Sequence, residues 1–379
     1  MSEKKMLSKA IKTGYIVLFV GVLGAGGARI TFGAQKTFSE NENRVLTKMP
    51  KATWTDIKKG EFQKKLENAT CDQFPMRDRW LEVATCADKA MGQSCINGVY
   101  LGKQGYLLEQ VLDSDLSQKT YKNNLQMIKM MAEDTKVDYQ VMMIPSPATV
   151  MKRMLPNNAV MYDADRMEQA GKDLFKEHWL DVTSPLQQKA KDTQVYFKTD
   201  HHWNLYGAYE GYTTFAKANE IEPKSMTSFD VRIASEDFLG TMYSKVLTAN
   251  PSKDKLCLIE NLPENLSVKR DGKDCELYDL EKLQKKDKYA VYFGGNYGLV
   301  EMDNPDGAKD ETLIVIKDSF ANSMVPFLLN DYKRVVMIDL RYYTSSVKEF
   351  IKSQNHPSVL VLYEMSNFAK DDHMYKLLR

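Results

Sequence analysis

The chain has 379 residues, which at about 150 residues per domain allows two or three domains. Hydrophobic residues make up 43% and charged residues 27% of the sequence, so the chain can bury a sizeable core and is not a highly charged disordered protein. The formal net charge is +1, so the basic excess that non-specific nucleic-acid binding requires is missing. Nucleic acid is therefore not an expected partner.

The N-terminal residues have the charge pattern of an export signal. Four lysines come first: Lys4, Lys5, Lys9 and Lys12. An uncharged run from Thr13 to Ala28 follows, which as a helix would span roughly 24 Å, slightly less than the core of a bilayer. Because the lysines flank one side only, we expect residues 1–34 to be a signal anchor, or a signal peptide cleaved near small residues such as Ala25. In both cases the later residues lie outside the cytoplasm, either anchored to the cell membrane or secreted.

Residues 35–110 are expected to form a polar linker followed by helical and hairpin segments. A helix is predicted near 54–67, and the stretch 71–95 also has helical character. The glycine-rich stretch 96–109 alternates turn residues with apolar ones, which is typical of a hairpin.

From residue 111 to residue 379, apolar strand-like runs alternate with helical segments. Strands are expected at 138–146, 195–198, 312–317, 334–339 and 358–364. Continuous apolar runs are typical of strands covered on both faces, and their alternation with helices predicts an α/β domain with a parallel sheet in three layers. Residues 225–300 break this alternation, so we interpret them as a β-rich insertion.

Two short polar segments follow predicted strands. In an extended backbone residues i and i+2 point to the same side, so the carboxylate of Asp200 can hold the imidazole of His202. Ser319 closes the most hydrophobic strand and precedes a helix, at the sheet edge where open α/β folds place their sites. The backbone N–H groups of a helix N-terminus suit an oxyanion. The pattern predicts a triad of Asp200 as orienting group, His202 as base and Ser319 as nucleophile.

Each of these segments also has a simpler interpretation. An Asp-Ser pair before a helix most often caps the helix, and an Asp-x-His pair is commonly a surface or capping arrangement. Asp200, His201 and His202 have the side chains of a metal site, but adjacent histidines on a strand point apart, so we expect no metal. Ser146 is a weaker candidate nucleophile, because its flanking prolines are mostly turn residues.

Oxyanion or substrate contacts are expected from a further set of residues: Gly295, Asn296, Asn322, His201 and Arg341. Consecutive glycines allow a backbone to approach a ligand closely, and Asn296 can donate a side-chain N–H. The structural alternatives are a glycine-rich turn around Gly295 and a helix cap at Asn322. For Arg341 we expect a structural ion pair first and a substrate contact second.

Several segments resemble the DHHW protein family, which is named for the residues present here as Asp200-His201-His202-Trp203. The segments are FSENENR, DQFPMRD, NGVYLGKQGYLLE, TDHHWN and IKDSFANSMVPF. This family is similar to the alginate-acetylation proteins, which are SGNH-hydrolase-like O-acetyltransferases. The resemblance implies an SGNH-hydrolase-like fold from about residue 38 onwards. Motif by motif, it gives the orienting, base and nucleophile roles to Asp200, His202 and Ser319.

The resemblance also implies an extracytoplasmic, serine-dependent O-acyltransferase that acetylates a cell-surface polysaccharide through an acyl-serine. The sequence has no soluble cofactor motif, so no cofactor is expected. The acyl donor would be delivered by a partner, a membrane-bound O-acyltransferase. The alternatives are a carbohydrate acetyl-esterase with the same triad, and a non-catalytic scaffold or glycan-binding partner of the membrane enzyme.

Overall fold

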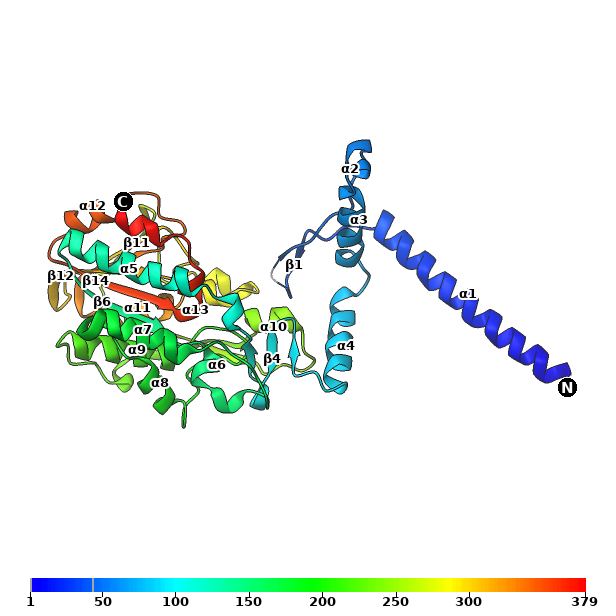
Figure 1. The fold of residues 1–379 in the computed structure, drawn as a ribbon, viewed down its shortest axis with the longest axis horizontal. Helices are drawn as coiled ribbons and strands as arrows, with labels where there is room; N and C mark the ends of the chain where they lie inside the picture. Colours follow the sequence, from blue (N-terminus) through cyan, green and yellow to red (C-terminus); the bar gives the residue numbers. More distant parts are fainter. Residues whose placement is uncertain (1, 43) are drawn as a thin grey trace. The chain divides into compact units, whose positions relative to one another are not determined.

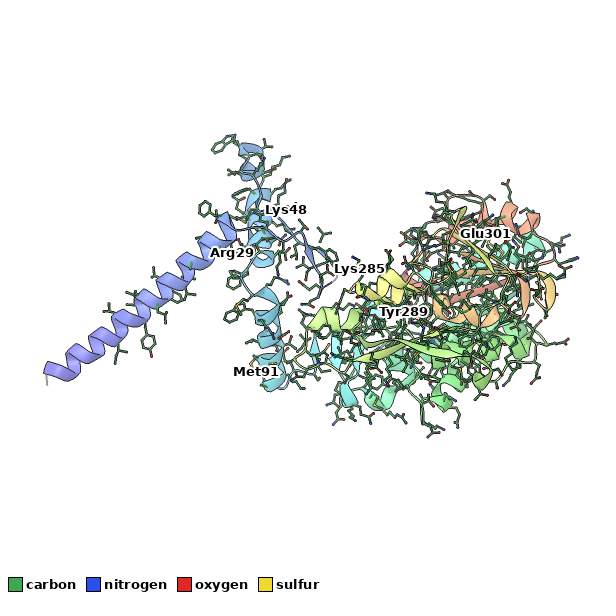
Figure 2. All side chains as sticks on the ribbon, turned by 180° about the vertical axis from the view of Figure 1, so that it is seen from behind. Arg29, Lys48, Met91, Lys285, Tyr289 and Glu301 are labelled. Carbon is green, nitrogen blue, oxygen red and sulfur yellow. The ribbon has the colours of Figure 1, made fainter. Side chains whose placement is uncertain are left out.

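The computed structural model describes residues 2–42 and 44–379, which divide into two compact units. The first unit extends to Met91 and includes residues 247–249, and the second consists of residues 92–246 and 250–379. In Figure 2, the labels Arg29 and Met91 mark the first unit, and Tyr289 and Glu301 mark the second. The hairpin expected at 96–109 belongs to the second unit.

The N-terminal segment is one helix, α1 (Ser2–Phe32). Its part Ile11–Phe32 has a mean hydropathy of 1.7 and is long and apolar enough to cross a membrane, a property that signal sequences share. Only 6% of its most apolar window is buried by protein, and Figure 2 shows side chains projecting from the helix. An apolar N-terminal helix was expected at this place. The lysine side chains before residue 11 lie outside the described part of the chain.

The rest of the first unit is mainly helical. The strands β1 (Phe38–Ser39) and β2 (Arg44–Val45) pair antiparallel, and three helices follow: α2 (Trp54–Lys58), α3 (Glu61–Asp72) and α4 (Arg77–Ala90). The single helix predicted near 54–67 is divided at Gly60, whose φ of +73° lies in the left-handed region that glycine adopts readily. The carboxylate of Asp72 accepts hydrogen bonds from Arg44 Nη1 at 3.1 Å and from the Thr47 N–H at 2.8 Å, which ties the β2 segment to α3.

The core of the second unit is a seven-stranded sheet with the order β10-β9-β11-β13-β12-β14-β6. Its strands are β6 (Asp138–Ile144), β9 (Ser267–Arg270), β10 (Lys273–Asp274), β11 (Leu299–Asp303), β12 (Lys309–Lys317), β13 (Tyr332–Ile338) and β14 (Pro357–Glu364). The strands β13, β12, β14 and β6 are parallel, as predicted from their apolar runs. The strands β11, β9 and β10 pair antiparallel, so the sheet is mixed rather than wholly parallel.

The prediction of a strand at 195–198 is wrong. Tyr196 forms only an isolated antiparallel bridge with Trp203, and this segment adds no strand to the central sheet. Val195 and Tyr196 are fully buried, and a short buried apolar run cannot be told from a strand by its periodicity. The bridge folds the chain back on itself, so Asp200 and His202 lie in the turn between its two sides.

Helices cover both faces of the central sheet (Figure 1). One face carries α5 (Gln118–Thr135), α7 (Ala164–Phe175), α12 (Val347–Ser353) and α13 (Met365–Lys370), and the other carries α6 (Pro147–Val150), α8 (Thr183–Lys189), α9 (Leu205–Ala218) and α11 (Ala321–Leu328). Successive residues of β6 alternate between the two cores, with Met142 in one cluster and Val141 in the other. The expected three-layer α/β class is confirmed.

The β-rich insertion expected at 225–300 contributes to two sheets. The strands β7 (Val231–Phe238) and β8 (Asp254–Ile259) form a separate antiparallel pair, with α10 (Thr241–Val246) between them in the chain. The strands β9 and β10 extend the edge of the central sheet instead. A third small sheet contains β3 (Cys95–Ile96), β4 (Val99–Leu101) and β5 (Leu107–Glu109), where a hairpin was expected.

Candidate active site

The turn that carries Ser319 lies between β12 and α11, at the carboxyl edge of the parallel strands. The side chain of Asp318 shapes this turn, because its Oδ1 accepts the Phe320 N–H at 3.0 Å. Its Oδ2 accepts the Glu364 N–H at 3.0 Å and Asn367 Nδ2 at 3.1 Å, which fastens the turn to the end of β14. Asp318 is therefore a structural anchor for the serine next to it.

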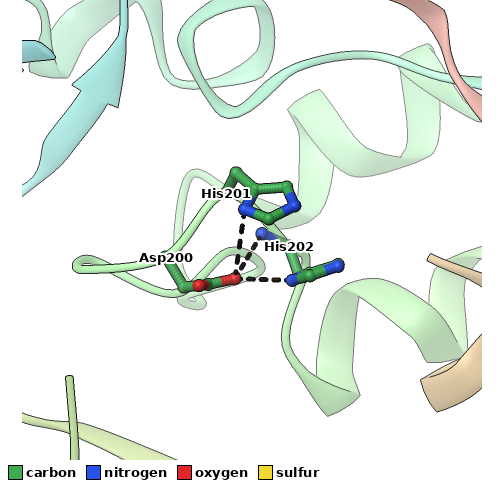
Figure 3. A group of neighbouring side chains, drawn as sticks. All are labelled: Asp200, His201 and His202. Carbon is green, nitrogen blue, oxygen red and sulfur yellow. Dashed lines mark hydrogen bonds and ion pairs between the residues drawn. The ribbon is translucent and has the colours of Figure 1, made fainter. Parts of the chain in front are cut away.

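The side chains of Asp200, His202 and Ser319 form one chain of hydrogen bonds. His202 Nδ1 lies 2.6 Å from Asp200 Oδ1, and His202 Nε2 lies 2.7 Å from Ser319 Oγ. The backbone N–H of His202 also donates to Asp200 Oδ1, at 3.0 Å (Figure 3). The geometry is that of an orienting carboxylate, a base and a nucleophile. The catalytic roles of the three residues remain predictions.

The charge states of this chain suit proton transfer. Burial by itself would raise the pKa of Asp200, but the two neighbouring histidines and several hydrogen bonds hold that pKa far below its ordinary value. Burial lowers the pKa of His202 from 6.5 to about 4; His201 acts in the same direction and Asp200 opposes it. At neutral pH the carboxylate is therefore charged and the imidazole is neutral, as a general base must be.

His201 is held by the second oxygen of the same carboxylate, through Thr241. The N–H and Oγ1 of Thr241 donate to Asp200 Oδ2 at 2.8 and 3.0 Å, and His201 Nδ1 lies 2.7 Å from Thr241 Oγ1. The backbone at Gly240 can lie close to the Asp200 side chain because glycine has no Cβ: a Cβ there would lie 2.2 Å from Asp200 Oδ2. The two imidazole rings lie against each other in Figure 3, with centroids 3.9 Å apart, so the expectation that adjacent histidines point apart is wrong. The imidazole hydrogen-bonded to Ser319 Oγ is that of His202.

Two aromatic side chains fix the base against the nucleophile turn. The ring of Tyr289 stacks on His202 with centroids 3.9 Å apart and planes within 10°, and its hydroxyl lies 3.1 Å from the Ser319 carbonyl oxygen. Trp203 is fully buried and its Nε1 donates to the Phe320 carbonyl at 2.9 Å. The position of Tyr289 in the second unit can be followed in Figure 2.

A buried lysine organises the two asparagines that the sequence singled out. Lys317 is 1% exposed, and its Nζ donates to Asn296 Oδ1 at 2.9 Å and to Asn322 Oδ1 at 2.8 Å. Burial lowers its pKa to about 8 and Asp339 opposes this, so the amine is mainly charged at neutral pH. Because an ammonium group only donates, it fixes both amide oxygens towards itself. Asn296 Nδ2 is thereby turned away from the lysine and has no partner among the described residues.

The other predicted oxyanion and substrate residues have different surroundings. Both polar atoms of the Asn322 amide have partners, since its Oδ1 accepts from Lys317 and its Nδ2 donates to Asn296 Oδ1 at 3.2 Å. Gly295 lies in a left-handed turn with a φ of +125°, and a Cβ there would meet no atom. Arg341 forms a two-pronged ion pair with Asp339 at 2.8 and 2.6 Å, as first expected. In the described part of the chain, the backbone N–H of Ser319 has no hydrogen-bond acceptor. Its role as an oxyanion donor, together with Asn296, stays a prediction.

The nitrogen and oxygen atoms of Asp200, His201 and His202 come within 4.8 Å of one another, as in a metal site. Both ring nitrogens of His202 nevertheless face hydrogen-bond partners, Asp200 on one side and Ser319 on the other. A ligand nitrogen needs a lone pair directed at the ion, which the contact with Ser319 Oγ occupies. The arrangement therefore suits proton transfer better than metal binding, and a metal-free site stays our prediction.

The rival serine has a structural role. Ser146 is the N-cap of α6, where its Oγ accepts the Thr149 N–H at 3.3 Å and lies 3.0 Å from Thr149 Oγ1. No imidazole contacts it in the described ranges 2–42 and 44–379. This contact pattern is that of a helix cap.

Sequence reasoning missed Thr241, Tyr289 and Lys317. Thr241 and Tyr289 come from the irregular region 225–300, where no periodicity connects them with the catalytic motif. Lys317 directly precedes Asp318 and Ser319 at the end of the most apolar strand. The available signal was a lysine at the end of a continuous apolar run. A strand that is covered on both faces also buries its last residues, so this lysine could be expected to be buried.

A comparison with protein families finds a match to this chain. The profile of the family described as DHHW protein matches residues 158–338, which contain Asp200, His201, His202, Trp203 and Ser319. The resemblance to the DHHW family is confirmed. No curated protein matches this DHHW-like chain.

Solved structures resemble the DHHW-like chain over about three quarters of its length. A DHHW family protein from Eubacterium siraeum is 18% identical, with a TM-score of 0.61, over 74% of this chain and 95% of its own. PatB1 from Bacillus cereus, solved with a sulfonyl adduct, is 22% identical, with a TM-score of 0.59, over 74% and 99%. The O-acetyltransferase domain of Pseudomonas putida AlgJ is 13% identical, with a TM-score of 0.43, over 74% and 93%. The first two likenesses show that this chain shares the α/β fold of those two proteins.

Proposed function

We propose that this chain is a membrane-anchored, extracytoplasmic O-acyltransferase that acetylates a cell-surface polysaccharide through an acyl-serine. One observation carries the proposal: the hydrogen-bonded chain Asp200–His202–Ser319, with 2.6 and 2.7 Å between its polar atoms. An unprotonated, oriented imidazole next to a serine hydroxyl is the arrangement that activates a serine for acyl transfer.

In the first half-reaction, His202 Nε2 takes the proton of Ser319 as Oγ attacks the carbonyl carbon of an acyl ester. The developing oxyanion would accept hydrogen bonds from the Ser319 N–H and from Asn296 Nδ2. The bond between the carbonyl carbon and the donor oxygen then breaks. The departing alkoxide takes the proton from His202, which leaves acyl-Ser319 and a free donor alcohol.

In the second half-reaction, a sugar hydroxyl gives its proton to His202 Nε2 while its oxygen attacks the acyl-serine carbonyl. The bond to Ser319 Oγ breaks and the serine regains the proton from His202. The products are an O-acylated sugar and the free enzyme. Water in place of the sugar would release a carboxylic acid, which is the esterase alternative.

The apolar helix at the N-terminus supports the proposed location. A helix of this hydropathy next to a lysine-rich flank would keep the lysines in the cytoplasm and the later residues outside. Activated acyl groups such as thioesters are made inside the cell, and one helix cannot carry them across. We therefore propose a membrane-bound O-acyltransferase as the partner that supplies the acyl group, without a soluble cofactor.

The proposal is tested by active-site labelling of the full-length chain in detergent with a fluorophosphonate probe, mapped by peptide mass spectrometry. The adduct is expected on Ser319, and it should disappear in Ser319→Ala and His202→Ala. Ser146→Ala is the matched control and should label as the wild type does. The sulfonyl adduct in the PatB1 structure makes a sulfonyl fluoride a suitable second probe. A folded wild-type chain that labels with neither probe would favour a non-catalytic scaffold.

A further inference from the structure

The helix α4 exposes an apolar face. Apolar side chains recur along it at positions i, i+3, i+4 and i+7 and continue in the residue that follows the helix, which is the spacing of one side of an amphipathic helix. They are Trp80, Val83, Ala84, Ala87 and Met91, and all are exposed. Trp80 is 59% and Val83 58% exposed. The exposed ring of Phe74 extends this α4 apolar face, because it lies edge to face against Trp80 with centroids 6.4 Å apart.

The contacts of α4 with the rest of the first unit are polar instead. Arg77, at the start of the helix, donates from Nη2 to Glu42 Oε1 at 3.2 Å, and Asp78 Oδ2 accepts from Asn41 Nδ2 at 2.6 Å. Glu42 and Asn41 belong to the segment between β1 and β2. The helix thus uses charged side chains to hold its own unit and turns apolar ones outward. A contiguous exposed apolar patch of this kind marks an interaction surface.

Hydrogen bonds hold the start of this face beside the end of α1. Gln73 directly precedes Phe74, and its side-chain amide accepts the Lys36 N–H and donates to the Lys36 carbonyl oxygen, both at 2.9 Å. Lys36 is four residues beyond Phe32, where α1 ends, so at most about 14 Å of chain separates them. Arg29 and Phe74 also line the same hollow of the first unit.

This short connection limits how far the face can lie from a membrane. The 22 residues Ile11–Phe32 span about 33 Å as a helix, which matches a hydrocarbon core of about 30 Å. Phe32 therefore lies near the outer boundary of the core when α1 crosses it, and the headgroup layer beyond is roughly 5–7 Å thick. A segment tied within about 14 Å of Phe32 is thus at the headgroups or just above them. Tryptophan and phenylalanine are typical side chains of this layer.

We propose that the α4 apolar face lies in the outer headgroup layer of the membrane, with Phe74, Trp80 and Val83 inserted among the lipids. The occupant of the face is the same lipid surface that α1 crosses. The contact gives the first unit a second attachment to the membrane besides α1. This inference rests on the membrane-anchored location in the proposed function and adds to it the protein surface that contacts lipid.

The test uses the full-length chain reconstituted in phosphatidylcholine vesicles, with tryptophan fluorescence as the readout. Lipids brominated near the headgroup quench tryptophans that lie in the interface. The Trp80 signal is the difference between the wild type and Trp80→Phe. This subtraction cancels the signals of the other tryptophans, which are Trp54, Trp179 and Trp203. We expect brominated lipid to remove most of the Trp80 signal and acrylamide in the water to remove little of it.

A reporter on the opposite side of the same helix is the matched control. Lys89 is exposed and lies nine residues after Trp80, which places it about 180° around the helix. In the double variant Trp80→Phe/Lys89→Trp, the introduced indole should be quenched by acrylamide and not by brominated lipid. Equal lipid quenching at the two positions would overturn the proposal, because no particular face of α4 would then meet the lipid.

A Trp80 signal that is equal in brominated and unbrominated vesicles would also overturn the proposal. Quenching by acrylamide would then place the face in water, and protection from acrylamide would place it against protein, such as the second unit or a second copy of the chain. Neither result would affect the acyl-serine chemistry of the proposed function.

Two further readouts on the same vesicles separate this inference from the proposed function. A wild type that fails to float with the vesicles at alkaline pH would contradict the membrane anchor, and this inference with it. A chain that floats and shows lipid quenching of Trp80, but does not label at Ser319 with a fluorophosphonate, would contradict the proposed acyl transfer and support the membrane contact.

Discussion

The indole Nε1 of Trp203 donates to the carbonyl oxygen of Phe320 at 2.9 Å, and Ser323 Oγ lies 3.0 Å from the same nitrogen. Trp203 directly follows the base His202, and Phe320 directly follows the nucleophile Ser319. One buried hydrogen bond therefore connects the two turns that must meet for proton transfer. It explains physically why a tryptophan completes the Asp-His-His-Trp motif.

Trp203→Phe removes this donor while keeping an aromatic ring. We expect the free energy of unfolding to fall by about 1–3 kcal/mol, because the Phe320 carbonyl loses its closest donor inside the protein. Labelling of Ser319 should slow as well, since the two turns lose a common anchor. Thermal unfolding and probe kinetics measure the two effects. Trp54→Phe, at an exposed position, is the control, and equal behaviour of both variants would refute the anchoring role.

Asp200→Asn tests the orienting carboxylate without changing its size. An amide can present its N–H to His202 Nδ1, which would favour the wrong tautomer and leave a proton on Nε2. Acylation of Ser319 is expected to fall by about 10⁴-fold, as in other serine triads. Stopped-flow measurement of ester cleavage provides the rate, with Asp310→Asn as an exposed control. A loss below about tenfold would mean that Asp200 does not orient the base.

The pH dependence should report the buried base. A histidine acts as a base only when unprotonated, and a pKa lowered to about 4 keeps His202 unprotonated to lower pH than usual. Ser319 labelling is expected to stay constant from about pH 7.5 down to about pH 5.5 and to fall as the pH approaches the pKa. Near-UV circular dichroism at each pH separates this loss from unfolding. A midpoint near the ordinary 6.5 would contradict the assignment.

Lys317→Met tests whether the lysine orients Asn296. Methionine has a similar length but cannot donate, so the Asn296 amide would be free to rotate away from the oxyanion. We expect kcat for ester cleavage to fall by roughly 10²-fold with little change in KM, because the contact forms only as charge develops. Lys348→Met, which removes a partly exposed ion pair with Asp134, should leave kcat unchanged. A change confined to KM would place Lys317 outside oxyanion stabilisation.

The sequence was most informative where one physical pattern dominates. Strands buried on both faces must be continuously apolar, so the cores of β12, β13 and β14 could be placed from composition alone. Their common direction then put Ser319 at the carboxyl edge of the sheet. Asp200 and His202 were found through their spacing, and the structure brings them to Ser319 even though the predicted strand before them does not exist.

The remaining features depend on contacts between distant segments. Val195 and Tyr196 are buried like strand residues, but Tyr196 forms its bridge with Trp203, on the other side of the turn, and not with the sheet. Glu364 was part of a predicted strand and gave no local sign that its carboxylate caps α13 by accepting the Asn367 N–H. The antiparallel strands β9 and β11 pair with strands that are distant in the sequence, and the alternation of apolar and polar residues does not predict which strands will pair.

The central claim is that Ser319 carries an acyl group during turnover. The most direct measurement is acid quenching of the full-length chain during reaction with 4-methylumbelliferyl acetate, followed by peptide mass spectrometry. We predict one acetyl group on Ser319, which a sugar acceptor removes and which His202→Ala does not acquire. A folded wild type that turns over the ester but is acetylated at another residue, or nowhere, would contradict it.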